Sequence, residues 1–155
     1  MSFVSMAIVA IFLVISFNIL GMTSGLHGAH SIHKRGIALL CYQMEQTLNS
    51  SCLAYLGYGC FCGPGGHGTP VDDVDRCCQT HDACYGQDKC KKSWYDYFVH
   101  YSVKCPEGSC QCTDSPVTSP CAHTACECDR VFAECLRATK HLVNQTHKSY
   151  DKKKC

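Results

Sequence analysis

The most informative segment of this chain is Cys77-Cys78-Gln79-Thr80-His81-Asp82-Ala83-Cys84-Tyr85. It places a histidine and an aspartate side by side between cysteines. Adjacent side chains on a helix point about 100° apart, so His81 and Asp82 cannot share one task. They can serve two neighbouring tasks, with a base that activates water beside a carboxylate that holds a cation. Disulfides on both sides would hold the two side chains rigidly without a large core.

A second helix can be placed against this segment from cysteine spacing. The outer cysteines of the segment are seven positions apart, and so are Cys128 and Cys135. In an antiparallel helix pair the opposing positions would be Cys77 with Cys135 and Cys84 with Cys128, so two disulfides could join the helices. The chain has 16 cysteines, and many other pairings remain open. If these two bonds form, Asp129 faces His81 across the helix pair.

The cysteine content indicates the class of protein. All 16 cysteines lie within residues 36–155, a length that suits one domain. This density in a short secreted chain is typical of a disulfide scaffold formed in an oxidising compartment. Zinc ligation is the alternative, but it favours isolated cysteine pairs in a reducing compartment. The net charge of +1 argues against nucleic acid or a strongly anionic surface as the dominant partner.

The N-terminal residues are expected to lie outside the fold. An uncharged apolar run over residues 6–20, followed by small residues, is typical of a secretory signal peptide over residues 1–25. The run is short for a transmembrane helix, although a membrane anchor is the alternative. Residues 26–35 then have the character of a propeptide that ends in the dibasic pair Lys34-Arg35. Cleavage there would start the mature chain near Gly36.

Two helices are predicted in the first half of residues 36–155. The first begins at Gly36, and its apolar positions recur at helical spacing: Ile37, Leu40, Met44 and Leu48. Such a stripe ordinarily packs into a core. The second helix begins with a cap at Thr69 and with Pro70 in its first turn, and it ends at Tyr85.

The remaining elements are a loop, a hairpin and a third helix. Residues 57–68 form a glycine-rich loop that Cys60 and Cys62 would fix covalently. Residues 95–112 predict a small hairpin, and a third helix runs from about residue 119 to residue 141. The predicted fold class is therefore mainly α and disulfide-rich. It comprises an N-terminal helix, a loop, two long antiparallel disulfide-linked helices and a small two-stranded β-hairpin.

The histidine and the two carboxylates indicate hydrolytic chemistry. Asp129 opposite His81 would fix the tautomer of the imidazole and stabilise the imidazolium that forms on proton uptake. Because the nearby cysteines are expected in disulfides, water is the natural nucleophile. Asp82 and the loop carbonyls supply hard oxygen ligands that suit Ca²⁺, which could polarise an ester carbonyl. The alternative is an ion pair that only ties two helices together.

These motifs resemble the secreted phospholipase A2 family, and most of all its pancreatic (group I) enzymes. Residues 77–85 look like its active-site helix, Tyr58-Gly59-Cys60-Phe61-Cys62-Gly63-Pro64-Gly65-Gly66 looks like its calcium-binding loop, and Cys126-Glu127-Cys128-Asp129 looks like its second helix signature. The resemblance covers essentially all of residues 36–155. It implies a secreted, extracellular carboxylic ester hydrolase, monomeric and peripheral at a phospholipid membrane surface. The implied reaction is calcium-dependent hydrolysis of the sn-2 ester of glycerophospholipids, which releases a fatty acid and a lysophospholipid.

The resemblance also implies roles for individual residues. His81 would be the general base, Asp129 its partner, and Tyr85 and Tyr101 the hydroxyls that complete the network. One Ca²⁺ would be held by the backbone carbonyls of Phe61, Gly63 and Gly65 and by the carboxylate of Asp82. The N–H of Gly63 would help to hold the oxyanion. Ile37, Leu40 and Met44 would wall the acyl slot and face the lipid, and Tyr97 would meet the substrate phosphate.

The family pattern implies six disulfides, namely Cys60–Cys155, Cys62–Cys78, Cys77–Cys135, Cys84–Cys128, Cys90–Cys121 and Cys112–Cys126. Cys41, Cys52, Cys105 and Cys110 depart from that pattern. We expect them to form two more bonds that tie the N-terminal region to the hairpin, with the pairing open. Pro64 is another departure, since the family usually has a large apolar residue there, and proline removes one N–H.

A catalytically silent relative that acts as a toxin, receptor ligand or matrix protein is the alternative function. Such relatives typically lose the histidine or the calcium-binding aspartate. Here His81 and Asp82 are both present, which favours the enzyme.

Overall fold

The computed structural model describes residues 36–85, 90 and 99–155. Its main elements are α2 (Gly36–Leu48), α3 (Asp73–Tyr85), β1 (Val103–Lys104), β2 (Gln111–Cys112) and α4 (Pro120–Thr139). Short 3₁₀ turns join them at Cys52–Tyr55, Pro106–Gly108, Lys140–Leu142, Gln145–His147 and Lys152–Lys154. The predicted fold class is confirmed. The proposed signal peptide and propeptide, residues 1–35, lie outside the described residues and stay predictions.

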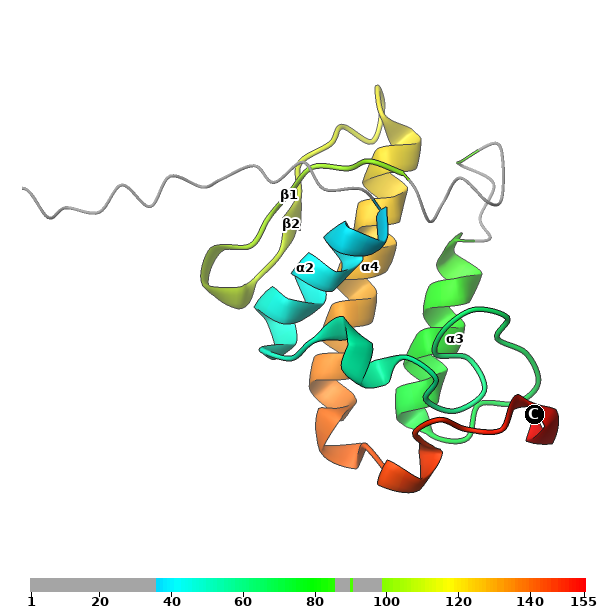
Figure 1. Ribbon diagram of the computed structural model, residues 1–155. Coiled ribbons are helices and arrows are strands. Elements are labelled where there is room, and N and C mark those ends of the chain that lie inside the picture. The colour runs from blue at the N-terminus through cyan, green and yellow to red at the C-terminus, as the bar shows by residue number, and fades with distance from the viewer. Residues whose placement is uncertain (1–35, 86–89, 91–98) are drawn as a thin grey trace, which may run out of the picture.

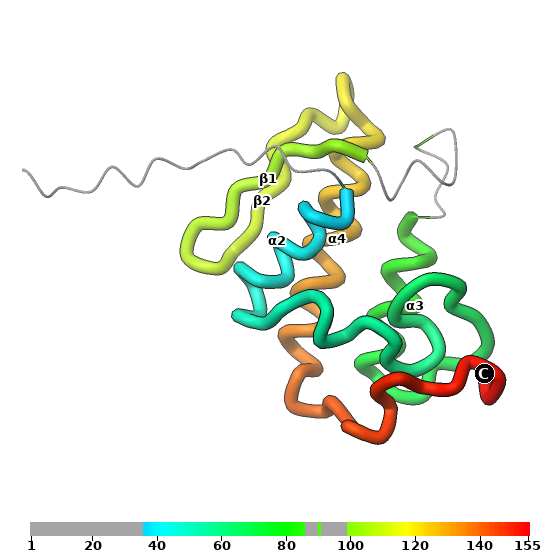
Figure 2. The backbone as a smooth tube through the Cα atoms, in the orientation of Figure 1, coloured from blue at the N-terminus to red at the C-terminus, as the bar shows by residue number. Residues whose placement is uncertain are grey.

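The helix α4 is the centre of the arrangement (Figure 1). Both α2 and α3 pack against it. The strands β1 and β2 pair antiparallel, with Val103 opposite Cys112 and Lys104 opposite Gln111. The backbone trace shows the C-terminal segment running alongside the loop that precedes α3 (Figure 2). Across the described part of the chain, no helix combines the length and apolar character needed to cross a bilayer.

The two disulfides predicted between the long helices are present. Cys77 bonds to Cys135 and Cys84 bonds to Cys128, with Cα–Cα distances of 5.8 and 5.7 Å. The structure also contains the other pairs that the family pattern implied: Cys60–Cys155, Cys62–Cys78, Cys90–Cys121 and Cys112–Cys126. All the cysteines lie within the described residues and none is free, so a zinc site built from thiolates is excluded.

The expected link between the N-terminal region and the hairpin is wrong. Cys41 of α2 bonds to Cys52 in the following 3₁₀ turn, at a Cα–Cα distance of 5.0 Å. Cys105 bonds to Cys110 across the turn of the hairpin, at 3.9 Å. Two additional bonds do form, but each closes a short local loop. Sharp turns between the partners, such as residues 106–108 with Glu107 at a φ of 51°, make this possible.

The buried face of α2 differs from the predicted stripe. Met44 and Leu48 are buried as expected, but Ile37 is 58% exposed and Leu40 is only partly buried. Leu39 and Gln43, outside that stripe, are fully buried. The reason is that α2 lies between two apolar clusters. One cluster contains Met44 and Leu48, and the other contains Leu39, so a wider face is covered than a single stripe provides.

The second helix begins later than predicted. It starts at Asp73 instead of near Thr69. The Asp72 side chain accepts a hydrogen bond from the N–H of Asp75, at 2.9 Å. A carboxylate in that position satisfies a free N–H of the first turn and favours the positive end of the helix dipole. Asp72 is therefore the cap, and residues 69–71 belong to the loop.

Asp72 also connects α3 to the C-terminal segment. Its carboxylate accepts a hydrogen bond from the Tyr58 hydroxyl at 2.5 Å and lies 2.8 Å from Nδ1 of His147. Burial alone would raise the pKa of Asp72, but the hydrogen bonds from Tyr58, Asp75 and His147 outweigh burial and lower it. Burial, together with the same contact, raises the pKa of Tyr58 to about 12. The phenol therefore remains a donor at neutral pH.

We expect Asp72 to make stability depend on pH. A carboxyl whose pKa is lower in the folded state stabilises the fold above its unfolded pKa of about 3.9. That contribution disappears as the pH falls through the lower, folded pKa. The melting temperature of the wild type should exceed that of Asp72→Asn at pH 5 and above, and the gap should close below about pH 4. A gap that stays constant from pH 7 to pH 2 in calorimetric melts would contradict this assignment.

Candidate active site

His81 and Asp129 form a buried pair between the two long helices. Nε2 of His81 lies 2.8 Å from Oδ1 of Asp129, with His81 8% exposed and Asp129 fully buried. The two helices hold this pair together because the rung Cys84–Cys128 stands next to it. Cys84 is one turn after His81, and Cys128 directly precedes Asp129. The two disulfides between α3 and α4 thus set the distance between the imidazole and the carboxylate.

Two tyrosines complete the surroundings of Asp129. The Tyr85 hydroxyl donates to Oδ1 at 2.6 Å and the Tyr101 hydroxyl donates to Oδ2 at 2.5 Å. Burial, together with the adjacent Asp129 carboxylate, raises the pKa of Tyr101. Its hydroxyl therefore stays protonated and keeps donating. With His81, three donors surround one buried carboxylate, so its oxygens keep hydrogen-bond partners away from water.

The protonation of the His81 ring follows from its partner. An ionised carboxylate only accepts hydrogen bonds, so Nε2 carries the proton toward Asp129. In the neutral ring, Nδ1 then has a free lone pair, and none of the described residues hydrogen-bonds to it. Phe132 stacks on the imidazole with a centroid distance of 4.4 Å, and Tyr85 meets it edge-on at 4.7 Å. The ring is held in one orientation with a basic nitrogen directed away from Asp129.

The sequence reasoning missed the contact with Phe132. The contact could have been predicted from the spacing, since Phe132 follows Asp129 by three residues and therefore lies on the same face of α4.

Asp75 organises the glycine-rich loop beside this pair. It is fully buried, and it accepts hydrogen bonds from the N–H groups of Cys60, Phe61 and Val71 at 2.7, 2.8 and 3.0 Å. A Cβ at Gly59 would overlap the carboxylate, so only glycine allows this close approach. The sequence reasoning also missed Asp75. Its signal was its position seven residues before Asp82, on the same face of α3.

Substituting Asp75 should damage both the loop and the fold. Asp75→Asn replaces one of the two accepting oxygens by an NH₂ group, which cannot accept from a backbone N–H, and Asp75→Ala leaves all three buried N–H groups without an acceptor. We expect a loss of about 3–5 kcal/mol in the free energy of unfolding for the alanine variant. Denaturant unfolding checks this value. Asp73→Ala, an exposed position in the first turn of the same helix, should change it by less than about 0.5 kcal/mol.

Asp82, the residue after His81, faces the glycine-rich loop. A Cβ at Gly66 would lie 2.7 Å from Oδ2 of Asp82 and 3.0 Å from Cα of Phe61, so the carboxylate stands directly against this glycine. Burial raises the pKa of Asp82, and the nearby His81 and Lys152 partly offset that rise. No salt bridge joins Asp82 to a basic side chain in the described part of the molecule. A half-buried carboxylate without an ionic partner suits a bound cation.

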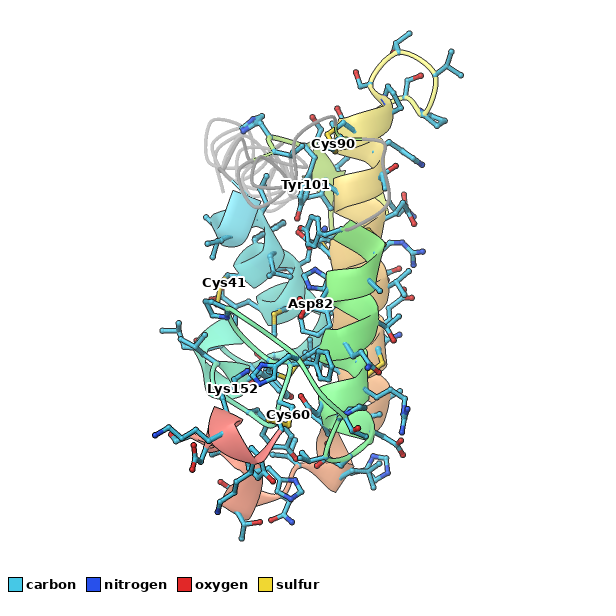
Figure 3. All side chains as sticks on the ribbon, turned by 90° about the vertical axis from the view of Figure 1, so that its right-hand side faces the viewer. Cys41, Cys60, Asp82, Cys90, Tyr101 and Lys152 are labelled. Carbon is cyan, nitrogen blue, oxygen red and sulfur yellow. A yellow bond between two sulfur atoms is a disulfide. The ribbon has the colours of Figure 1, made fainter. Side chains whose placement is uncertain are left out.

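The C-terminal segment reaches the same loop. Lys152 donates from Nζ to the carbonyl oxygen of Cys60 at 2.7 Å, and Cys155 bonds to Cys60. Figure 3 shows Lys152 beside Cys60. The beginning of the loop is therefore held by a disulfide, by a lysine and by Asp75.

The predicted ligand carbonyls belong to Phe61, Gly63 and Gly65 in this loop. His67 Nδ1 lies 3.0 Å from the Gly65 carbonyl oxygen, which has a second lone pair available. Among residues 36–85, 90 and 99–155, no cluster of three or more His, Cys, Asp or Glu side chains could hold a metal. A cation at Asp82 would therefore depend on backbone carbonyls. Carbonyl and carboxylate oxygens are the donor set that Ca²⁺ prefers, so the residues present fit calcium.

Comparison with known proteins decides the family. The phospholipase A2 family model matches residues 38–150. A phospholipase A2 of Calliactis polypus is 38% identical over 133 residues, covering 83% of this chain and 79% of that protein. The basic phospholipase A2 caudoxin of Bitis caudalis is 46% identical over 106 residues, covering 68% and 82%. Phospholipase A2 OS1 of Oxyuranus scutellatus scutellatus is 50% identical over 91 residues, covering 56% and 58%.

The chain belongs to the phospholipase A2 family. It is an enzyme of that family by the match of its sequence and by the names of its relatives. These matches do not distinguish the groups within the family, so the likeness to the pancreatic enzymes stays a prediction.

The predicted acyl-slot residues of this phospholipase A2 have different environments. Ile37 is exposed and Leu40 is half-buried, whereas Met44 is 2% exposed and packs in the core. Met44 packs in the cluster that also holds Leu48, and its role in the acyl slot stays a prediction. Tyr97, the predicted phosphate contact, lies outside the described residues.

Proposed function

We propose that this phospholipase A2 hydrolyses the sn-2 ester of glycerophospholipids at a membrane surface, in a calcium-dependent reaction that releases a fatty acid and a lysophospholipid. The observation that carries the proposal is the His81–Asp129 pair. It leaves a basic ring nitrogen next to a carboxylate, Asp82, that has no ionic partner among the described residues.

His81 acts as the general base in this proposal. Nδ1 takes a proton from a water molecule while the water oxygen attacks the ester carbonyl carbon. The imidazolium then returns that proton to the departing glycerol oxygen, and the carbon–oxygen bond of the ester breaks. Water is the nucleophile because every cysteine is in a disulfide. The products balance as one carboxylic acid and one alcohol.

Asp129 and the two tyrosines hold the base in place. The carboxylate fixes the proton of the ring on Nε2 and stabilises the positive charge that develops during the reaction. Tyr85 and Tyr101 donate to the carboxylate, which holds it in one orientation. These three groups act on the orientation of His81 and do not themselves need to touch the substrate.

The carboxylate of Asp82 and the carbonyl oxygens of Phe61, Gly63 and Gly65 would hold one Ca²⁺. When bound, the ion supplies electrophilic polarisation of the ester carbonyl. The N–H of Gly63 would donate to the same carbonyl oxygen as it gains negative charge. Ile37 and Leu40, which are exposed and half-buried, would contact the lipid. We expect the protein to be secreted to the extracellular space, since eight disulfides in a small domain form in an oxidising compartment. We also expect it to be a monomer.

One assay tests this function directly. The chain from Gly36 onward is incubated with phosphatidylcholine vesicles labelled at the sn-2 acyl group, with Ca²⁺ and with a chelator. We expect labelled fatty acid with Ca²⁺ and none with the chelator, while a label at sn-1 stays in the lysophospholipid. Release that continues with the chelator would contradict the calcium dependence. An absence of release from a folded protein that binds Ca²⁺ would favour the silent relative.

A further inference from the structure

Gln43 of α2 is a buried polar residue with no role in the chemistry above. It is fully buried, and the other buried polar residues of the described chain are Asp75, His81 and Asp129. Burying an amide is unfavourable unless hydrogen bonds replace those made to water. An apolar residue of similar size, such as methionine, would avoid this cost at a core position. The presence of glutamine therefore needs an explanation from its contacts.

The Gln43 amide nitrogen contacts acceptors on two residues. Nε2 lies 3.1 Å from the Tyr101 hydroxyl oxygen and 3.2 Å from the carbonyl oxygen of Cys126. The carbonyl oxygen of Cys126, and its disulfide Sγ at 3.7 Å, can only accept, and the Tyr101 proton is directed to Asp129 at 2.5 Å. Both partners must therefore accept, so the nitrogen of the amide, and not its oxygen, faces them. One amide proton serves each acceptor, which fixes the orientation of the side chain.

The amide oxygen of Gln43 does not offset the free-energy cost of burying this side chain. Its oxygen, Oε1, is the buried side-chain atom that lacks a hydrogen-bond partner in the described structure. A buried acceptor without a partner costs stability. A residue kept only to stabilise the fold would not carry this cost, so the value of Gln43 is expected in what its nitrogen does for Tyr101.

We propose that Gln43 is a positioning residue for the catalytic network, acting on His81 through Tyr101 and Asp129. By donating to the Tyr101 oxygen, Gln43 holds the phenol with its proton on Asp129. Hydrogen bonds in such a chain polarise one another, so this donation strengthens the Tyr101–Asp129 bond. The inference rests on the proposed function, in which the orientation of Asp129 sets that of the His81 ring. The hydrogen bond also brings α2 into the site, because Gln43 precedes Tyr101 by 58 residues in the sequence.

A double-mutant cycle tests the proposal. Gln43→Met keeps the volume of the side chain but removes the donor, and it is made in the wild type and in Tyr101→Phe. We expect a loss of kcat of roughly five- to tenfold in the wild type, with the KM for vesicles and the Kd for Ca²⁺ unchanged. In Tyr101→Phe the same substitution should cause no further loss. An equal loss in both backgrounds, or no loss in the wild type, overturns the proposal. Gln46→Met, an exposed glutamine on the same helix, is the matched control.

A second measurement does not depend on turnover. The Tyr101 hydroxyl proton, identified by its absence in Tyr101→Phe, is observed by proton NMR at low field because it is held on Asp129. In Gln43→Met this signal should move upfield or exchange with water faster, and in Gln46→Met it should not change. An unchanged signal in Gln43→Met overturns the positioning role. A wild type that shows the signal but releases no fatty acid contradicts the proposed function instead.

Discussion

His81→Gln is expected to lower kcat by about 10³- to 10⁴-fold while the fold and Ca²⁺ binding survive. Glutamine can donate to Asp129, so the buried carboxylate keeps a partner, but an amide nitrogen has no basic lone pair to accept a proton from water. The proposed ligands of the ion come from Asp82 and the loop, not from the imidazole. The measurements are the rate of fatty acid release from vesicles and a calorimetric titration with Ca²⁺.

His123→Gln is the matched control for this substitution. His123 also has one ring nitrogen in a hydrogen bond, Nδ1 to the Asp114 carbonyl at 2.9 Å, but it lies near the start of α4 and away from the His81 pair. Its kcat should stay within about twofold of the wild type, as expected for a site without contacts to the chemistry. If His81→Gln loses Ca²⁺ binding and thermal stability together with activity, the residue is structural and the general-base role is wrong.

Asp82→Asn is expected to weaken Ca²⁺ binding by at least about 100-fold and to abolish hydrolysis at low millimolar Ca²⁺. The substitution keeps the size of the side chain and removes the charge, which is the main attraction for a hard divalent cation. Burial raises the pKa of Asp82 in the absence of metal, so the charged form gains less there than it does in water. The melting temperature without Ca²⁺ should therefore not fall, whereas the stabilisation by added Ca²⁺ should disappear.

Asp73→Asn provides the comparison on the same helix. Asp73 lies in the first turn of α3, and its side chain is largely exposed, 3.6 Å from Arg76. It should bind Ca²⁺ and hydrolyse phospholipid like the wild type. The ligand assignment is wrong if Asp82→Asn retains Ca²⁺ affinity in calorimetry. A variant that loses stability in the absence of Ca²⁺ would instead indicate that Asp82 holds the loop.

The predictions that succeeded depend on fixed spacing along one helix. Two residues seven positions apart lie on one face whatever the helix packs against, so the rungs from Cys77 and Cys84 could be predicted. The predictions that failed depend on a choice of partner. Whether Cys41 pairs with Cys52 or with a cysteine of the hairpin is decided by turns that spacing does not describe. The buried face of α2 was likewise misjudged, because helical period does not say how many clusters a helix contacts.

The sequence by itself determined the mainly helical fold class, the family and the juxtaposition of His81 with Asp129. These follow from local motifs and from the geometry of two helices joined by disulfides. Only the tertiary structure decided that Asp75 holds the glycine-rich loop and that Gln43 reaches Tyr101. The physical reason is that a helix fixes the direction of its own side chains, whereas the hydrogen-bond partner of a buried polar group comes from packing between distant segments.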